Sequence, residues 1–367
     1  SMSADMNNTD NIQIFFEDCK PNSVELLPPD INQSAFEFIP TNTTQILYGL
    51  GAIKGTGLAA IELILESRES KGPFKNLFDF CARLDLRKVN RRVVESLIRG
   101  GAFETLESNR ASLLASVNLA ITAAEQGKAN IAQNSLFGEE QTQKVDMVHM
   151  DPWTPQQKLQ EEKAALGFYF SGHPFTFFEK RVRPFIKTQI KELKPQEQPY
   201  LIAGVIVAIR IRMTARGKMA IVTLDDAISR VDVVVGNDLL TQSQRLVQED
   251  QLLIVEGRVS HDDFTGGIRV TARKLFDLAT ARNQFAHHLK ISCNGQSDAA
   301  KLRDILKPYC GISQNNLKRC RVKIDYHNEK GHVELLLGQD WQVDLHDELI
   351  DGLTQWLSEE NVKILYN

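Results

Sequence analysis

The sequence lacks long apolar runs and has few cysteines. No stretch of its 367 residues approaches the roughly 18 consecutive apolar residues needed to span a bilayer, and its first residues do not read as a secretion signal. Its five cysteines are far apart and form no CxxC pair, which argues against a structural zinc site or a disulfide framework. We therefore expect a cytoplasmic protein with reduced thiols and no membrane partner.

Recognisable catalytic groups are also missing. The acidic pairs at 225–226 and 262–263 lie in turn contexts, where Asp favours local hydrogen bonds, and neighbouring side chains at a strand end point to opposite faces. Two-metal phosphoryl transfer instead needs carboxylates that converge from neighbouring elements. No Ser-His-Asp or Cys-His arrangement is evident. We predict no catalytic residue, no metal ligand and no cofactor in this chain.

The net charge of −4 does not suggest a nucleic-acid partner, but the charge is unevenly distributed. Residues 1–40 hold one Lys or Arg against seven Asp or Glu, whereas residues 41–128 hold twelve against nine. A mildly basic segment therefore follows an acidic one. This distribution permits DNA binding without being evidence for it.

Hydrophobic periodicity changes along the chain and predicts a multidomain α+β protein. Apolar residues recur at helical spacing up to about residue 126 and at strand spacing from about residue 200. Between them, residues 125–150 are polar and rich in Gln, which is typical of a linker. The predicted segments are an amino-terminal piece at 1–40, a helical domain at 41–128, a linker at 129–150, a helical connector at 151–198, an OB-fold β-barrel at 199–282 and a small α+β domain at 283–367.

The OB-fold prediction depends on the order of its elements. Five short strands with one helix before the fourth is the OB-fold order. The strand-like runs are 201–209, 219–224, 231–235, 252–259 and 268–272, and a helical stretch at 237–248 precedes the fourth. In the last segment we predict strands at 287–293, 320–327 and 332–338 and helices at 297–308 and 346–358.

The first segment that could bind a ligand is residues 50–57, which precede an amphipathic helix. Glycines let the backbone turn tightly and bring N–H groups close to a phosphate oxygen, and the dipole of the following helix adds attraction. Lys54 can add positive charge. We predict that Gly51, Lys54, Gly55, Thr56 and Gly57 belong to the hairpin of a helix-hairpin-helix motif, which binds the DNA backbone without reading bases.

A second, poorer copy of this hairpin is predicted at residues 99–103. It contains Gly100 and Gly101 between two helices, and two copies would form a tandem unit that straddles a duplex. The alternative interpretation is that these glycines only end a helix as C-caps and contact no ligand. The pattern does not decide between the two.

The predicted linker contains an isolated apolar pair, Leu136 and Phe137, preceded by Gln133 and Ser135. An exposed pair of large apolar side chains in a solvated segment suggests a pocket on a partner protein, with the glutamine as an orienting hydrogen-bonding group. The pair could equally fold back onto the helical domain.

The predicted OB-fold carries a basic rim. Arg210, Arg212, Arg216 and Lys218 gather around its first turn, and Phe264 lies on the turn before the last strand, where it could stack on a base. OB-folds that bind single strands combine such a groove with aromatic residues. Because aromatic residues are scarce here, a purely structural or protein-docking barrel is the alternative.

Several motifs resemble the bacterial C-family replicative polymerases, the DNA polymerase III alpha subunits. The resemblance is carried by the strings Leu27-Pro28-Pro29-Asp30-Ile31-Asn32, Tyr48-Gly49-Leu50-Gly51-Ala52-Ile53-Lys54-Gly55, Asn90-Arg91-Arg92-Val93, Leu97-Ile98-Arg99-Gly100-Gly101-Ala102-Phe103, Leu166-Gly167-Phe168-Tyr169-Phe170-Ser171-Gly172-His173-Pro174 and Asp262-Asp263-Phe264-Thr265-Gly266-Gly267. It covers nearly the whole chain and thins after about residue 285.

The resemblance implies roles that the residue pattern does not show. Residues 1–40 would be the end of the fingers domain, and Arg91 and Arg92 would join the duplex-binding residues. Residues 133–137 are similar to the internal motif that binds the beta sliding clamp. The OB-fold would lie near single-stranded template, and residues 283–367 would bind the tau subunit of the clamp loader.

The resemblance also implies an incomplete polymerase. The palm, whose carboxylates hold Mg2+ in the family, has no counterpart in this sequence, so we expect a carboxy-terminal fragment of a DNA-directed DNA polymerase that is inactive alone. The alternative is a stand-alone nuclease or ligase built on helix-hairpin-helix and OB modules. Such an enzyme needs a nucleophile or a metal-binding cluster, and neither is found at a credible spacing.

Overall fold

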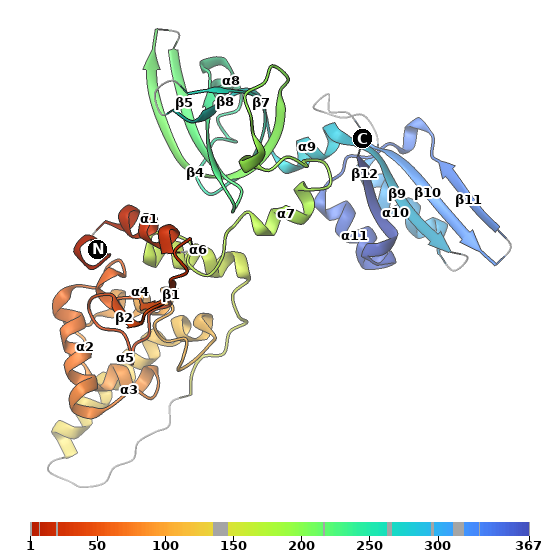
Figure 1. Cartoon of the computed structure of the whole chain (residues 1–367). Helices are drawn as coiled ribbons and strands as arrows, with labels where there is room; N and C mark the ends of the chain where they lie inside the picture. The colour runs from red at the N-terminus through yellow and green to blue at the C-terminus, as the bar shows by residue number, and fades with distance from the viewer. Residues whose placement is uncertain are drawn as a thin grey trace. The chain divides into compact units, whose positions relative to one another are not determined.

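The structure is a computed structural model that contains two compact units (Figure 1). We call Ser1–His173 unit 1 and Pro174–Asn367 unit 2. The structure describes all residues other than 1, 7, 20, 135–145, 216, 263–265, 295–296, 311–318, 330 and 367. It also does not describe the side chains of residues 10 and 130–134. No helix in the described part of the chain combines the length and the apolarity that a membrane crossing requires.

Unit 1 is mainly helical and contains one small sheet. In this sheet the order is β1-β3-β2, with β1 parallel and β2 antiparallel to β3. Its elements are η1 (Met2–Asp5), α1 (Thr9–Cys19), β1 (Glu25–Leu27), β2 (Ile39–Asn42), β3 (Gln45–Leu47), η2 (Leu50–Ala52), α2 (Leu58–Lys71), α3 (Leu77–Arg83), α4 (Arg91–Arg99), α5 (Arg110–Asn134) and α6 (Pro155–Leu166).

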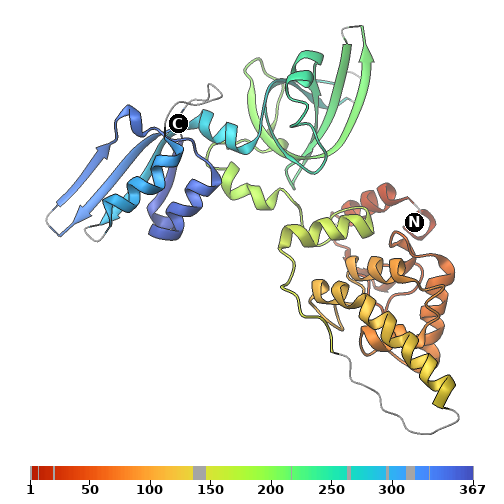
Figure 2. The same cartoon turned by 180° about the vertical axis from the view of Figure 1, so that it is seen from behind.

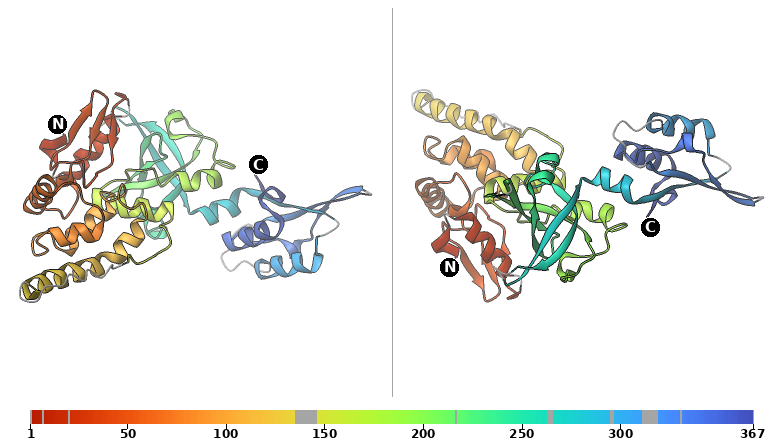
Figure 3. Two further views of the ribbon diagram at one scale, coloured as in Figure 1. Left: turned by 90° about the horizontal axis from the view of Figure 1, so that it is seen from below. Right: turned by 90° about the horizontal axis from the view of Figure 1, so that it is seen from above.

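Local sequence signals explain where several of these helices begin. The side chains of Asn76 and Asn90 accept hydrogen bonds from the first turns of α3 and α4, and Thr154 does the same for α6, which has Pro155 in its first turn. The long helix α5 is seen clearly in Figure 3. It continues to Asn134, beyond the expected start of the linker, because this stretch is rich in the good helix formers Ala, Glu, Gln and Lys.

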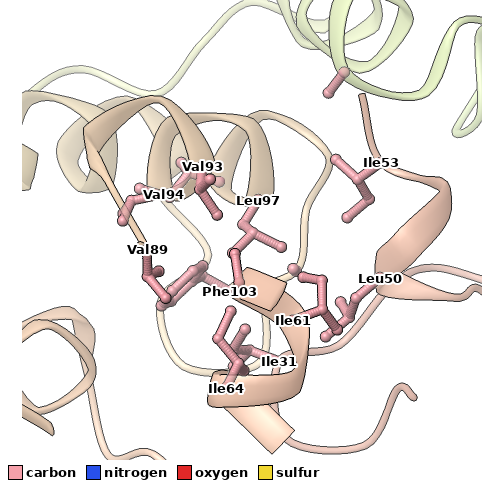
Figure 4. Close-up of a cluster of buried hydrophobic side chains, with 14 of the residues drawn as sticks. Ile31, Leu50, Ile53, Ile61, Ile64, Val89, Val93, Val94, Leu97 and Phe103 are labelled. Atoms are coloured by element: carbon pink, nitrogen blue, oxygen red, sulfur yellow. The ribbon is translucent and has the colours of Figure 1, made fainter. Parts of the chain in front are cut away.

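The core of unit 1 joins the two predicted hairpins (Figure 4). Leu50 and Ile53 of the first hairpin pack in the same cluster as Ile61 of α2, Leu97 of α4 and Phe103 of the second. Each of these side chains is at most 2% exposed. Burying one such side chain stabilises the fold by about 1.5–3 kcal/mol, so this cluster fixes the two hairpins relative to one another.

Unit 2 begins with a closed barrel whose strand order is β4-β5-β6-β8-β7. The single parallel pair, β6 with β8, closes it. This is the OB-fold order, and the five predicted strands correspond to these five. The elements are α7 (Thr176–Val182), η3 (Ile190–Glu192), β4 (Tyr200–Thr214), β5 (Gly217–Asp225), β6 (Arg230–Val235), α8 (Asn237–Gln242), β7 (Leu252–His261) and β8 (Ile268–Phe276).

A small α+β domain completes unit 2. Its sheet has the order β11-β10-β9-β12, and α10 and α11 both lie on one face of it, as the view from behind shows (Figure 2). The short strand β12 was not predicted. The elements are α9 (Leu278–Phe285), β9 (Ala286–Asn294), α10 (Ala299–Leu306), η4 (Lys307–Tyr309), β10 (Arg321–Asn328), β11 (Gly331–Leu336), η5 (Gln339–Trp341), α11 (Asp347–Leu357), η6 (Glu359–Asn361) and β12 (Val362–Tyr366).

The predicted connector at 151–198 is divided between the two units. Helix α6 belongs to unit 1, whereas α7 lies in unit 2 and packs on the barrel through Phe175 and Val182. The predicted helix at 237–248 is shorter, because α8 ends at Gln242. Within unit 2, Arg282 of α9 donates to the Leu345 carbonyl and pairs with Asp347 at 2.7 Å, which joins the barrel to the last domain.

Candidate nucleic-acid interface

The first predicted hairpin is a tight loop between η2 and α2. Gly55 has a φ of +84°, a conformation that residues with a Cβ rarely adopt. The Thr56 hydroxyl is buried, 2.7 Å from the Ile53 carbonyl and 2.9 Å from the Leu50 carbonyl, either of which can accept its proton. Gly51 lies against the Phe36 ring, with no room for a Cβ. Thr56 and Gly51 therefore shape the hairpin from inside.

The outer side of this hairpin presents backbone donors. Gly55, Gly57, Leu58 and Ala59 are exposed, and in the described part of the chain no acceptor meets their amides. Gly57 caps α2 without a side chain, and the first turn contains no acidic residue that would compete for the amides. Exposed amides at a helix amino terminus attract anions through both hydrogen bonds and the helix dipole.

Two cations flank these amides. Lys54 and Arg92 are exposed and form no ion pair with any described residue, whereas the neighbouring Arg91 pairs with Glu95 at 2.6 Å. Arg92 comes from α4, yet its Nε lies only 3.8 Å from the position that a Cβ on Gly55 would occupy. The fold thus brings an unpaired guanidinium to the exposed loop.

The second predicted hairpin has the geometry of a helix C-cap. Gly101, at a φ of +93°, donates its amide to the Ile98 carbonyl, and Ala102 donates to the Leu97 carbonyl. Gly100 donates to Ser96, and both glycines are buried. Their amides are occupied inside the protein and cannot donate to a phosphate. The arrangement matches the C-cap alternative that the sequence left open.

Buried charges hold this second loop in place. Arg110, whose side chain is 5% exposed, lies 2.6 Å from Glu104 and 3.2 Å from Glu162 of α6. Burial alone would raise the pKa of Glu104, but hydrogen bonds from Lys158 and Arg110 together hold it below its usual value. Arg110 is also the group that a Cβ on Gly101 would strike. A side chain at position 101 would therefore displace Arg110 from its ion pairs with Glu104 and Glu162.

Only part of the predicted basic rim of the OB-fold consists of cations that could contact a ligand. Arg210 is neutralised by Asp232 at 2.5 Å, whereas Arg212 and Lys218 are exposed and form no ion pair with any described residue. Between the arginines, Ile211 is 54% exposed, and Met213 beyond them is 74% exposed. These apolar side chains were not predicted. Arg216 and Phe264 lie outside the described residues.

Three of the four acidic residues at 225–226 and 262–263 have partners within unit 2, and Asp263 lies outside the described residues. Asp225 pairs with Arg230 at 2.7 Å, and Asp226 accepts hydrogen bonds from the amides of Ile228, Ser229 and Ile190. Asp262 lies 3.9 Å from Arg269. Across the described ranges, no three His, Cys, Asp or Glu residues are grouped as they would be to hold a metal ion.

The predicted clamp-binding residues are at positions 133–137, around the end of α5. Ser135, Leu136 and Phe137 lie outside the described residues, and so does the side chain of Gln133. On the carboxyl side, residues 146–150 run back along α5. The Ser116 hydroxyl accepts the Val148 amide at 2.9 Å, and the Ser112 hydroxyl accepts the Met150 amide at 3.0 Å. This anchoring by α5 was not predicted.

Comparison with known proteins assigns this architecture. Three families match successive parts of the chain: a helix-hairpin-helix motif at residues 23–113, an OB-fold nucleic acid binding domain at 200–278, and the C-terminal domain of DNA polymerase III subunit alpha at 301–357. DNA polymerase III subunit alpha of Neisseria meningitidis serogroup A is 39% identical over 99% of this chain. The Escherichia coli K12 subunit is 36% identical over 100% of it.

The chain belongs to the DNA polymerase III alpha family. This confirms the predicted resemblance and the multidomain α+β fold. The chain spans about a third of the length of these relatives, 32% in both cases. Asparaginyl-tRNA synthetase from Pyrococcus horikoshii is similar in structure over 25% of the chain, with 21% identity and a TM-score of 0.22, and this adds nothing to the assignment.

The family matches coincide with structural elements. The helix-hairpin-helix match runs from before β1 into α5 and includes both hairpins, and the OB-fold match contains β4 to β8. The DNA polymerase III alpha C-terminal match extends from α10 to the end of α11. Helix α6 lies outside all of them, although it packs into the core of unit 1 through Ala165 and Leu166.

Proposed function

We propose that this chain holds duplex DNA through the first hairpin, as a part of a replicative DNA polymerase. The observation that carries the proposal is the group of exposed residues with free amides at Gly55, Gly57, Leu58 and Ala59. Lys54 and Arg92 lie beside them and form no ion pair with any described residue. This arrangement suits a phosphate oxygen. Backbone amides that contact phosphate oxygens carry no sequence information, so we expect binding that is independent of sequence.

Lys54→Glu tests this proposal in a salt titration of duplex binding. Reversing the charge should weaken binding to all duplex sequences alike and remove about one unit from the salt slope, because one phosphate contact releases about 0.9 counterion. Lys71→Glu is the matched control, since Lys71 is exposed at the opposite end of α2. Equal affinity of wild-type protein and Lys54→Glu at every salt concentration would refute the role of the hairpin.

For the linker, we propose binding to the beta sliding clamp through Gln133, Ser135, Leu136 and Phe137. The support is the isolated apolar pair in a polar segment together with membership of the polymerase family. The test compares clamp binding by the wild-type chain with a variant in which Gln133, Leu136 and Phe137 are all alanine. Loss of binding in the variant supports the proposal, and equal binding by both contradicts it.

For the barrel, we propose weak, sequence-independent binding of single-stranded DNA. Its support is the family match to OB-fold nucleic acid binding domains, together with the exposed Arg212 and Lys218 beside apolar Ile211 and Met213. Fluorescence anisotropy with a labelled oligonucleotide tests it. A wild-type signal that Arg212→Ala and Lys218→Ala together do not reduce would favour the alternative of a protein-docking barrel.

Three further proposals concern the whole protein: its location in the cytoplasm, its partner at the carboxy-terminal domain and its activity. We propose that the carboxy-terminal domain at 283–367 recruits the tau subunit, and that the complete protein is a Mg2+-dependent DNA polymerase. The chain spans only 32% of its relatives, and its sequence resembles no palm segment. With Mg2+ and nucleotides, the chain alone should therefore not extend a primer. Template-dependent incorporation at a stoichiometric rate would contradict this.

A further inference from the structure

Helix α6 and the turn that follows it lie against the proposed duplex-binding hairpin. The amide of Lys54 donates to the Ala165 carbonyl at 2.7 Å, which fixes the hairpin backbone to the last turn of α6. Ala165 is 3% exposed, so this hydrogen bond lies at a buried junction. The family match to the helix-hairpin-helix motif ends at residue 113, well before α6.

Because Gly167 has no side chain, the Lys54 side chain can lie against it. It caps α6 with a φ of +94°, in the left-handed region. A Cβ on Gly167 would lie 2.6 Å from the Cβ of Thr9 and 3.1 Å from Cε of Lys54. The end of the aliphatic part of Lys54 therefore lies over this glycine.

The rest of the same string holds this turn in position. Leu166 is fully buried, and one of its methyl groups lies 3.2 Å from the position of a Cβ on Gly100. Phe168 and Phe170 pack on Phe16 of α1, with ring centroids 5.1 and 5.5 Å apart. Phe170 also meets the ring of Tyr48, just before the first hairpin, at 6.0 Å. These contacts join the turn to both predicted hairpins.

We propose that the Ala165–Gly167 turn is a positioning element for the duplex-binding hairpin. The Ala165 carbonyl fixes the backbone of Lys54, and the bare face of Gly167 directs the Lys54 side chain toward the phosphate that the hairpin amides contact. This inference rests on the proposed function of the hairpin. It makes the string at 166–170 part of the DNA-binding unit.

The test is a double-mutant cycle between Lys54 and Gly167 on the full 367-residue chain. Asn is chosen for Gly167 because it tolerates the left-handed conformation, while its side chain occupies the path of Lys54. Lys54→Ala should weaken duplex binding about tenfold at low salt and lower the salt slope by about 0.9. Gly167→Asn should have the same two effects, and the double variant should show no further loss.

Gly172→Asn is the matched control for this cycle. Gly172 lies in the same string, is exposed, and a Cβ there would meet only Leu159 at the ordinary distance of 3.7 Å. It should bind duplex like the wild type. If the Gly167→Asn variant does not fold, the double variant Thr9→Gly/Gly167→Asn replaces it. Thr9→Gly removes the Thr9 side chain, which makes the closest contact with the new Cβ, and the Asn side chain still occupies the path of Lys54.

The outcomes distinguish failure of the positioning role from failure of the proposed duplex binding. If Lys54→Ala weakens binding and a folded Gly167→Asn does not, the positioning role is wrong and the hairpin function remains. Losses that add in the double variant would also overturn the positioning role, because Gly167 would then act independently of Lys54. If Lys54→Ala itself has no effect, the proposed function fails and the inference fails with it.

Discussion

The guanidinium of Arg110 lies 3.2 Å from the carboxylate of Glu162, and their side chains are only 5% and 1% exposed. The pair connects the start of α5 to α6. Glu162 also accepts the amide of Ser171 at 2.9 Å, so one carboxylate of α6 contacts both α5 and the segment that follows Gly167. A buried pair of this kind is costly to break, because the remaining charge has no solvent to replace its partner.

We therefore expect Arg110→Met to destabilise unit 1 by about 3–5 kcal/mol. Arg91→Met is the control, since Arg91 forms an exposed pair with Glu95 one helical turn away, which contributes about 0.3–0.5 kcal/mol. The measurement is hydrogen exchange of the α4, α5 and α6 amides along a urea titration. Losses of equal size in the two variants would show that the buried pair has no special role.

Two glycines should respond in opposite ways to alanine. Gly101 has a φ of +93°, and its Cβ would lie 2.5 Å from a guanidinium nitrogen of Arg110, so Gly101→Ala should cost at least about 1–3 kcal/mol. Gly127 lies inside α5 with nothing within 4 Å of its Cβ position, so Gly127→Ala should stabilise by about 0.5–1 kcal/mol. Calorimetric melting temperatures should fall for the first variant and rise for the second.

The segment at 146–150 should detach from α5 when its serine anchors are removed. Ser116→Ala and Ser112→Ala remove the acceptors of the Val148 and Met150 amides, at a cost of about 0.5–1.5 kcal/mol each, because these exposed residues can bind water instead. Hydrogen exchange at these two amides should become faster. Ser70→Ala is the control, because the Ser70 hydroxyl donates to carbonyls of its own helix and, among the described residues, accepts no amide from another segment. Unchanged exchange in the anchor variants would contradict the assignment.

Acid should weaken the carboxy-terminal sheet through Asp325. Hydrogen bonds from Lys290 and His332 lower the pKa of Asp325 from 3.8 to about 2. Because the pKa is lower in the folded state, its stabilising contribution is complete above the unfolded value and is lost as the pH falls from about 4 to about 2. Asp325→Asn should remove this part of the pH dependence of unfolding.

Asp340→Asn is the control for the acid titration. Asp340 is exposed and forms no ion pair with any described residue, so its substitution should leave the pH dependence unchanged. Chemical shifts of the Asp325 side chain, followed from pH 5 downward, report its pKa directly. A midpoint near the ordinary value would contradict the interaction.

Local sequence patterns predicted the barrel strands and the first hairpin. The alternation of apolar residues predicted the five barrel strands, because one face of each strand must be buried. The glycine spacing predicted the first hairpin, because a left-handed turn at Gly55 is a property of a single residue. The same reasoning could not choose between a ligand site and a C-cap at Gly101, since both begin with the same backbone conformation.

What the sequence determined by itself is the order of the barrel elements and the exposed glycine hairpin, since each depends on neighbouring residues. Which polar groups remain free was decided only by the tertiary structure. Folding brings Glu162 to Arg110 and Asp232 to Arg210, which neutralises those arginines, while Arg92 is placed beside Gly55 and pairs with no described residue. It also brings Ala165 to Lys54. Such pairs join residues that are distant in sequence, and no local periodicity encodes their contact.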